Sequence, residues 1–489
     1  MRRWLAALAA LGLITTAVAW LLGPTPQRLA DTTTGDPALA ESVRAVIADP
    51  TGYHGLAVAR TDADQTSFAG LGEAAAGEPV EPDTAFEVGS IGKVLTGMLL
   101  ADLAADGVVD PDQPLGELLP AVDFDDPAVA EITLAELASH RSGLPRLRMA
   151  GLRTVLNGLT WQLRGGDPYA GQDVDWLAAT LPSATVSAGE PAVDYSNYGM
   201  ALLGYALAEH TGVPYPELVR QRILDPLGMS ATSYHLDGDP LPAHRAAGGT
   251  ADGRTMAPWQ GSGYAAAGIG LWSTADDLAT LVAAVSDGTA PGADAATARF
   301  EAGPDEHVGY GWFTDLVNGD ELTWHNGASG GFRSYVGFEP ATGQGVVVLG
   351  NTDRDVVPLG QQLLTQAGDP VDRAGVGWYA IVVTLVVSCL GGLSLLFLAT
   401  RPEIDRLRLV SNGAWAMALP AIAYQYGAWS TVPALVWALG VGVSVVALAQ
   451  AVRRWPAVPV VAGRFRWLRW VASTLLALAA PLLVLWFYT

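Results

Sequence analysis

Long apolar segments near both ends of the chain constrain its fold more than any other feature. Residues 4–23 read WLAALAALGLITTAVAWLLG and carry no charge. A stretch of about 20 apolar residues is long enough to cross a bilayer as a helix. Further apolar segments follow at roughly 376–399, 413–429, 432–452 and 468–488. The sequence therefore predicts about five transmembrane helices, one N-terminal and four C-terminal, in the region 1–23 and the region 376–489.

The N-terminal segment has two interpretations. Its length favours an uncleaved anchor, because the apolar core of a cleaved signal peptide is usually shorter. The sequence Ala-Val-Ala at 17–19 also offers a cleavage site, so residues 1–23 are a signal-anchor or a signal peptide. Residues 24–37 are rich in Pro, Thr and Asp, which is typical of a linker. Among the later segments 413–429 is the weakest candidate, because it is short and contains Pro420.

Arginines between the apolar segments indicate an orientation. The loop 400–412 contains three arginines and the segment 453–469 contains five, whereas the connection near residue 431 is uncharged. Positively charged loops remain in the cytoplasm. The arginine pair that follows Met1 gives the N-terminus the same placement. We therefore expect a multi-pass protein of the cell membrane whose central part, residues 24–375, lies outside the cytoplasm.

The central part is strongly acidic. Residues 24–375 contain 47 acidic and 17 basic residues, whereas the flanks carry a net charge of +8. Nucleic acid is excluded as a partner class, because phosphate binding requires a basic surface. The apolar flanks indicate that the bilayer is a partner. The first three C-terminal segments hold no charge, and this disfavours a transporter, because transporters usually need ionisable groups within the membrane. Cys389 is the one cysteine, so no disulfide forms within the chain.

Residues 38–368 are expected to form a single α+β domain. Strand patterns occur near both of its ends, at 53–71 and within 307–351. Helical patterns fall at 38–49, 90–107, 133–140, 173–181, 197–211, 215–225, 274–286 and 358–366. The simplest arrangement is one antiparallel sheet built from both ends of the domain. Terminal helices would cover this sheet, and a helical subdomain would be inserted between its strands.

Lys93 is the one lysine in the chain, and it follows Ser90 by three residues at the start of a predicted helix. That spacing places both side chains on one face of a helix. A serine hydroxyl becomes a nucleophile when a neighbouring base removes its proton, which a neutral amine can do and a guanidinium cannot. The pairing can also arise by chance, because a Ser-x-x-Lys sequence is a short motif. The catalytic interpretation gains support from the helix N-terminus, whose amides can stabilise an oxyanion.

Two later stretches carry further candidates. Tyr195 and Asn197 stand two apart in VDYSNYGM, and a phenol can transfer protons while an amide can orient a carbonyl or an amine. The alternative is an ordinary aromatic residue followed by a helix cap. His325 and Gly327 occur in HNGASGG, where the histidine is expected to end a strand and the glycine allows close backbone approach. A lone histidine is also often structural.

In this order the three elements resemble the penicillin-recognising serine hydrolases: Ser-x-x-Lys, then Tyr-x-Asn, then Lys/His-x-Gly. Tyr-x-Asn points to the branch that is related to class C β-lactamases and also holds D-alanyl-D-alanine carboxypeptidases, D-aminopeptidases and esterases. The stretches LASHRSGLP, ILDPLGM, AAGIGLWSTADDLATLV and GYGWF also resemble this branch. The resemblance covers roughly residues 38–366 and implies the β-lactamase/transpeptidase-like fold.

The resemblance implies a role for each motif residue. Ser90 would be the acylated nucleophile, and Lys93 and Tyr195 would share the acid and base work. Asn197 would position the substrate and Lys93, and His325 and Gly327 would line the substrate site on the flanking strand. The N–H groups of Ser90 and Ala328 would form the oxyanion hole. No metal and no cofactor are implied.

The motifs also depart from the family pattern. His325 stands where β-lactamases usually have Lys, Asn326 where Thr is common, and Arg141 where a small polar residue is common. The implied activity is therefore hydrolysis of D-amino acid peptides, amides or small esters through an acyl-enzyme, with β-lactam hydrolysis less expected. The alternative is a non-catalytic penicillin-binding sensor in the membrane. Intact Ser90, Lys93 and Tyr195 favour the enzyme.

Overall fold

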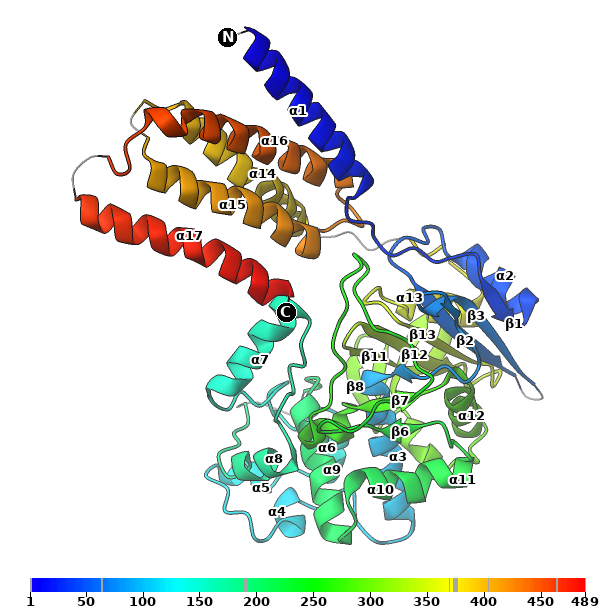
Figure 1. The fold of residues 1–489 in the computed structure, drawn as a ribbon. Coiled ribbons are helices and arrows are strands. Elements are labelled where there is room, and N and C mark those ends of the chain that lie inside the picture. Colours follow the sequence, from blue (N-terminus) through cyan, green and yellow to red (C-terminus); the bar gives the residue numbers. More distant parts are fainter. Residues whose placement is uncertain are drawn as a thin grey trace. The chain divides into compact units, whose positions relative to one another are not determined.

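The computed structural model describes residues 2–62, 65–187, 192–368, 370–372, 377–402, 404–462 and 465–488. The chain forms two compact units (Figure 1). The sheet unit comprises Arg28–Ala251 and Thr255–Arg373, and the helical unit comprises Met1–Gln27, Asp252–Arg254 and Ala374–Thr489. Residue 376, the expected start of an apolar segment, lies outside the described residues, as do the loop residues Glu403 and Arg464.

An antiparallel sheet of ten described strands forms the centre of the sheet unit. Its order is β1-β3-β2-β13-β12-β11-β10-β9-β8, and β4 also pairs with β3. The strands are β1 Thr33–Gly35, β2 Gly55–Thr61, β3 Thr66–Ala75, β4 Glu78–Pro79, β8 Phe300–Gly303, β9 Glu306–Val308, β10 Phe313–Val317, β11 Asp320–Ser329, β12 Phe332–Phe338 and β13 Gly345–Gly350. Because β2 pairs with β13, the two ends of the domain share one sheet, as the sequence predicts.

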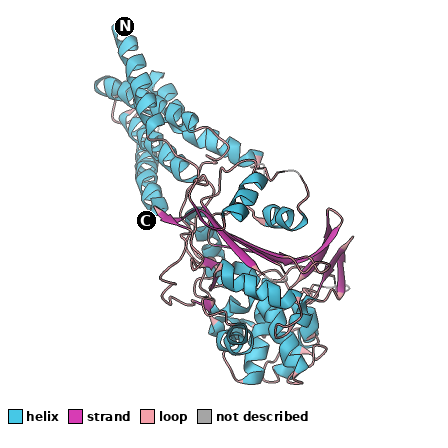
Figure 2. Ribbon diagram, turned by 90° about the vertical axis from the view of Figure 1, so that its right-hand side faces the viewer, coloured by secondary structure: helices cyan, strands magenta, loops and turns pink. Residues whose placement is uncertain are grey.

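Both faces of this sheet are buried. Side chains along a strand alternate between faces, so Leu56 and Val58 of β2 pack with helices α2 (Pro37–Val46) and α13 (Val357–Thr365). Ala57 and Ala59 join the larger core on the opposite face. That core includes helix α12 (Ala275–Ser286) and the inserted helices. Figure 2 shows helices on both sides of the strands.

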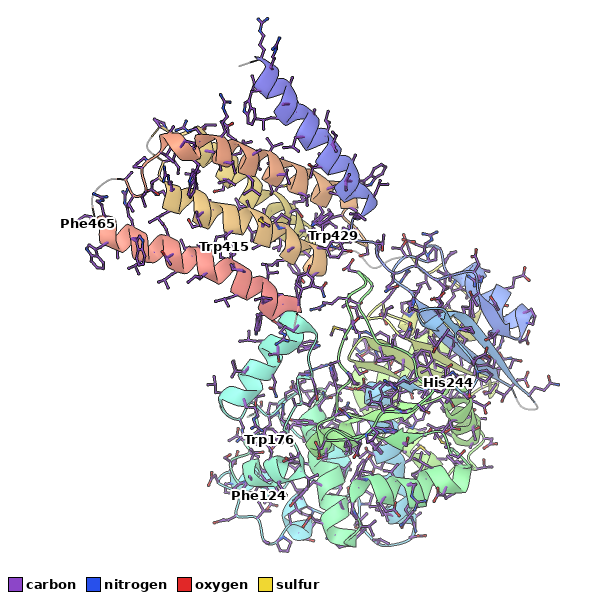
Figure 3. The ribbon with its side chains drawn as sticks, in the orientation of Figure 1. Phe124, Trp176, His244, Trp415, Trp429 and Phe465 are labelled. Carbon is purple, nitrogen blue, oxygen red and sulfur yellow. The ribbon has the colours of Figure 1, made fainter. Side chains whose placement is uncertain are left out.

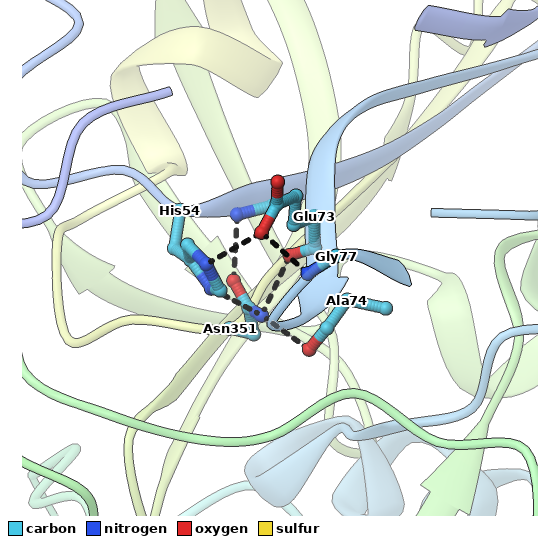
Figure 4. Close-up of polar contacts among 6 residues, drawn as sticks. His54, Glu73, Ala74, Gly77 and Asn351 are labelled. Carbon is cyan, nitrogen blue, oxygen red and sulfur yellow. Dashed lines mark hydrogen bonds and ion pairs between the residues drawn. The ribbon is translucent and has the colours of Figure 1, made fainter. Parts of the chain in front are cut away.

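A buried amide ties three strands together at one end of the sheet (Figure 4). Asn351 follows β13, and its Oδ1 accepts the N–H of Gly55 in β2 at 2.7 Å. Its Nδ2 donates to the carbonyl oxygens of Glu73 and Ala74 in β3, at 3.1 and 3.0 Å. Asn351 itself is buried and its amide needs partners, so these hydrogen bonds help to fix the β2–β13 seam.

The helical subdomain lies between β5 and β8 in the chain, as expected. A three-stranded sheet runs β5 (Phe86–Glu87), β7 (Leu271–Ser273) and β6 (Ser233–Tyr234). The helices are α3 Gly92–Ala105, α4 Leu115–Leu118, α5 Pro127–Ala130, α6 Leu134–Ala138, α7 Gly151–Arg164, α8 Val174–Thr180, α9 Asn197–Thr211, α10 Tyr215–Val219 and α11 Asp225–Leu227, with 3₁₀ turns η1 Gly89–Ile91, η3 Ser262–Ala267 and η4 Ala293–Ala296 and a π-turn η2 Arg220–Leu224. Trp176 of α8 packs against Tyr264 of η3 with ring centroids 6.1 Å apart (Figure 3).

The helical unit contains α1 Arg2–Leu21, α14 Trp378–Thr400, α15 Arg406–Tyr426, α16 Ala434–Arg454 and α17 Arg466–Tyr488, with a short turn η5 at Trp455–Ala457. Helix α1 runs antiparallel to α16. Trp4 donates to Gln450 near one end, and a side chain at Gly23 would lie 3.2 Å from Ala434 near the other. Small residues let α14 and α16 approach closely. A Cβ at Gly440 of α16 would lie 2.0 Å from the carbonyl oxygen of Ser388 in α14.

Four helices of the described chain are long and apolar enough to cross a membrane: Arg2–Leu21, Trp378–Thr400, Ala434–Ala457 and Arg466–Tyr488. The expected fifth segment, 413–429, corresponds to α15, which is not among them. Helix α15 begins earlier, at Arg406, and contains polar residues together with Pro420. Its last turn leads to Trp429, which is buried and donates its Nε1–H to the carbonyl of Tyr424 at 3.0 Å (Figure 3).

Candidate active site

Three backbone segments converge at the turn that carries Ser90. The turn η1 follows β5, and Gly89 has a positive φ of 54°. A Cβ at Gly89 would lie 2.7 Å from the carbonyl oxygen of Ala328 in β11. A Cβ at Gly268, just after η3, would lie 1.9 Å from the carbonyl oxygen of Gly89. Glycine is therefore required at both positions for the serine turn to pack between β11 and η3.

Ser90 and Lys93 are directly paired. Lys93 Nζ donates to Ser90 Oγ at 2.8 Å and to the carbonyl oxygen of Ala267 at 2.8 Å. Lys93 is fully buried, whereas Ser90 is partly accessible. Burial, assisted by the positive charge of Arg146, holds the pKa of Lys93 well below its usual value. The amine can therefore be neutral and accept the proton of Ser90.

Tyr195 completes the group around the serine. It lies just before α9, and its side chain hydrogen-bonds to Ser90. Lys93 Nζ lies 4.9 Å from the centre of the Tyr195 ring. Burial raises the pKa of Tyr195 to about 12, although its hydrogen bond to Ser90 opposes this shift. The phenol is therefore protonated at neutral pH, which suits it to donate a proton.

Asn197 lies at the first turn of α9 and is buried. Its Nδ2 donates to the hydroxyl of Tyr169 at 3.0 Å. Its Oδ1 is buried without a hydrogen-bond partner among the described residues. The expected contact with Lys93 is not among the hydrogen bonds of the described chain. A buried acceptor without a partner is costly, so the amide oxygen of Asn197 is a candidate contact for a bound group.

His325 lies inside β11 rather than at the end of a strand, which corrects the sequence expectation. The strand continues because His325 through Ser329 pair with Val336 through Phe332 of β12. The imidazole is buried, and its Nδ1–H donates to the carbonyl of Asn326 at 2.6 Å. Burial and the charge of Lys93 lower the pKa of His325 to about 3. The ring is therefore neutral at physiological pH, unlike the lysine that β-lactamases usually have there.

Gly327 and Ala328 place β11 against the serine turn. A Cβ at Gly327 would lie 2.0 Å from the carbonyl oxygen of Val88 and 2.2 Å from Ser334 Oγ, so only glycine fits. Ala328 is solvent-exposed and lies beside Gly89. The structure thus brings the main chain of Ala328 next to the turn that carries Ser90, where an oxyanion hole would require it.

His140 was not predicted as a site residue, and it packs on Tyr195. The two ring centroids are 4.4 Å apart. The carbonyl of His140 accepts the N–H of Asp194 at 2.8 Å, and its Nδ1 accepts the N–H of Ser196 at 3.3 Å. Both neighbours of Tyr195 are therefore held by His140, which itself has a positive φ of 58°. The stretch LASHRSGLP was the available signal, but a sequence does not show this backbone conformation.

Arg146 is a second residue that the motifs did not reveal. It is exposed, and its guanidinium lies 5.1 Å from the centre of the Tyr195 ring. No hydrogen bond or ion pair of its guanidinium occurs among the described residues. Its positive charge helps to lower the pKa of Lys93, and it opposes the rise in the pKa of Tyr195 that burial causes. Arg141 instead stacks on the ring of Phe300 at 4.1 Å.

The described residues contain no group of three or more His, Cys, Asp or Glu side chains placed to hold a metal ion. The site presents a serine hydroxyl, a buried amine and a phenol. These groups are the ones that acyl transfer to a serine requires.

The sheet unit of this chain is similar to known proteins. A family model described as Beta-lactamase matches residues 43–366, which are more than half of the chain. D-alanyl-D-alanine-carboxypeptidase/endopeptidase AmpH of Escherichia coli (strain K12) is 31% identical over 188 residues, covering 37% of this chain and 46% of AmpH. Esterase EstB of Burkholderia gladioli is 28% identical over 246 residues, covering 44% of this chain and 60% of EstB. The chain thus spans about half the length of the curated relatives it matches.

A solved structure of a class C β-lactamase has the same fold. It superposes with a TM-score of 0.54 at 20% sequence identity, covering 65% of this chain and 92% of that one. The family match contains every motif residue that converges on Ser90. This chain therefore belongs to the β-lactamase family of serine hydrolases.

Proposed function

We propose that this protein is a membrane-anchored, extracytoplasmic hydrolase that acts through an acyl-enzyme on Ser90. The observation that carries the proposal is the 2.8 Å hydrogen bond between Lys93 Nζ and Ser90 Oγ, with the amine fully buried. A partly accessible hydroxyl is activated as a nucleophile when a buried amine lies beside it to take its proton.

Acylation follows from this arrangement. Lys93 Nζ takes the proton of Ser90 Oγ as the oxygen bonds to the substrate carbonyl carbon. The N–H groups of Ser90 and Ala328 stabilise the carbonyl oxygen as it becomes negative. Tyr195 donates its proton to the leaving nitrogen or oxygen, whose bond to carbon then breaks, and Lys93 returns a proton to the phenolate. Its high pKa makes Tyr195 a donor rather than the first base.

Deacylation repeats these steps with water in place of serine. A water molecule gives its proton to the base and bonds to the acyl carbon, and the ester bond to Ser90 Oγ breaks. Ser90 recovers its proton, and the product leaves as a carboxylic acid. Neither step requires a metal or another cofactor.

The substrate class is proposed from the relatives and from the third motif. The name of AmpH describes a D-alanyl-D-alanine carboxypeptidase, and that of EstB an esterase. A neutral His325 lacks the positive charge that a lysine would carry at this position beside Lys93. D-amino acid peptides of the cell-wall type, amides and small esters are therefore the proposed substrates.

Membrane anchoring and orientation are part of the proposal. The antiparallel packing of α1 and α16 puts Arg2 and Arg3 at the same end as Arg453, whose guanidinium lies 5.0 Å from the Trp4 ring. The α15–α16 connection lies at the other end, near the end of α1. This arrangement agrees with arginine-rich loops in the cytoplasm and the sheet unit outside.

The proposal is tested with the full-length protein in detergent micelles. We expect turnover of p-nitrophenyl esters, D-alanyl-D-alanine peptides or D-amino acid amides, and a loss of about a thousandfold or more in Ser90→Ala. Ser67→Ala is the matched control, because Ser67 lies in β3, away from the convergent turn. A protein that binds a fluorescent penicillin covalently but turns over no member of this panel would be a penicillin-binding sensor. Activity that survives in Ser90→Ala would refute the proposal.

A further inference from the structure

Helix α7 exposes an apolar stripe on the surface of the sheet unit. The exposed fractions are 72% for Leu152, 47% for Val155, 49% for Leu156, 46% for Leu159 and 37% for Leu163. These positions are three or four residues apart, so the side chains follow one face of the helix. Met149 precedes the helix and is 61% exposed. An exposed stripe of this kind marks an interaction surface.

The opposite face of α7 is the one that faces its own domain. Thr154 is buried, and Trp161, seven residues later and itself 37% exposed, packs edge-on against Trp259 with centroids 6.1 Å apart. Residues seven apart lie on nearly the same side of a helix. The five exposed apolar side chains are rotated about half a turn away from that side. The stripe is therefore directed away from the core of the sheet unit.

The charge around α7 is opposite to that of the domain. Between Glu136 and Asp167 the chain contains no acidic residue and five arginines. Arg141 and Arg146 stack on Phe300 and Tyr195, so the arginines on or beside α7 are Arg148, Arg153 and Arg164. The surrounding residues 24–375 contain 47 acids. An apolar stripe on a positively charged segment matches the chemistry of a membrane surface with anionic headgroups.

We propose that α7 lies on the surface of an anionic phospholipid bilayer, with its apolar stripe among the upper acyl chains. This inference goes beyond hydrolysis and rests on the membrane anchoring that is part of the proposed function. The proposed membrane anchor raises the local concentration of α7 at the bilayer, so a weak interfacial affinity is sufficient for α7 to bind there. A contact between two copies of α7 would leave its arginines without an acidic partner, because α7 holds no acid.

The test uses full-length protein in phospholipid nanodiscs. Cys389→Ser removes the natural thiol, and Leu156→Cys carries an environment-sensitive NBD label. Thr280→Cys, on the exposed side of α12, is the matched control. Lipids with a doxyl group on the acyl chain quench the label only where it enters the bilayer. Nanodiscs of phosphatidylglycerol are compared with nanodiscs of phosphatidylcholine.

We expect a blue shift and quenching at position 156 in phosphatidylglycerol, less quenching in phosphatidylcholine, and neither effect at position 280. Protein that co-elutes with nanodiscs but keeps the 156 label in water would overturn this inference and leave the anchoring intact. A blue shift without quenching would also overturn it, since a protein surface would then cover the stripe. Equal quenching in both lipids would overturn the preference for anionic lipid. Failure to co-elute would refute the anchoring and the inference together.

Discussion

In the proposed mechanism one residue, Lys93, carries much of the chemistry. Arginine supplies every other fixed positive charge in the chain, but it cannot give up a proton near neutral pH. Lys93 is fully buried and bonded to Ser90, so the one lysine stands where deprotonation matters. The sequence could identify Ser90 and Lys93 because their spacing on a helix is fixed. It could not show that burial lowers the pKa of the amine.

Arg146 is expected to tune this amine. Its positive charge disfavours protonated Lys93, so Arg146→Gln should raise the pKa of Lys93. Activity needs the neutral amine, and the acidic limb of the kcat/KM profile should therefore move to higher pH. A pH profile with an ester substrate measures the shift.

Arg141→Gln is the control for this experiment, because Arg141 stacks on Phe300 instead of facing Tyr195. An unchanged acidic limb in Arg146→Gln would contradict the electrostatic role. His325 should contribute no inflection between pH 5 and 8, since its pKa of about 3 keeps it neutral there.

His140 is expected to position Tyr195 without touching the substrate. Asparagine tolerates the left-handed backbone of this residue but lacks the ring that packs on Tyr195. His140→Asn should lower kcat by about ten- to a hundredfold while KM changes little, because proton donation would suffer more than binding. His210→Asn, an exposed site on α9, is the matched control. A rise in KM with an unchanged kcat in His140→Asn would indicate a binding role instead.

At the scale of elements, the contact between β11 and the serine turn positions the site. Gly327→Ala would place a Cβ against the carbonyl oxygen of Val88 and against Ser334. We expect a loss of about 1–3 kcal/mol in the free energy of unfolding and most of the activity, because β11 and the turn must separate. Thermal unfolding and ester turnover measure both effects.

Gly158→Ala is the control, since a Cβ there meets nothing within 4 Å and the helix interior favours alanine. It should raise stability by about 0.5–1 kcal/mol and leave turnover unchanged. Equal behaviour of the two variants would contradict the tight approach at Gly327.

Elements with an inward apolar face could be predicted, and others could not. The pairing of β2 with β13 follows from two apolar strand patterns at opposite ends of the domain. His325 was expected at a strand end because glycines follow it, yet β11 continues to Ser329 through its pairing with β12. Helix α7 gave a weak signal, since Gly158 interrupts it and Ala150 at its start offers no capping side chain.

At the scale of the whole molecule, α15 decides the topology. Without a crossing by α15, the connection at 427–433 would lie on the cytoplasmic side. The arginine pattern instead predicts that this connection lies outside the cytoplasm. The antiparallel packing of α1 and α16 is consistent with that prediction. In a Cys389→Ser background, we therefore expect Pro433→Cys to react with a membrane-impermeant maleimide in intact cells. Val460→Cys, an exposed position in the arginine-rich segment, should react only after permeabilisation. The reverse pattern would refute the orientation.

The most direct test of the central claim is the location of the acyl group. Trypsin cleavage after Arg60 and Lys93 gives a single peptide, residues 61–93, that carries Ser90 and ends at the one lysine. After reaction with a fluorescent penicillin or a slow ester, we predict an adduct on Ser90, no adduct in Ser90→Ala, and acylation slowed by about 10² to 10⁴-fold in Lys93→Arg. An adduct on Ser67 or elsewhere, or equal acylation rates in Lys93→Arg and the unmodified protein, would contradict the account.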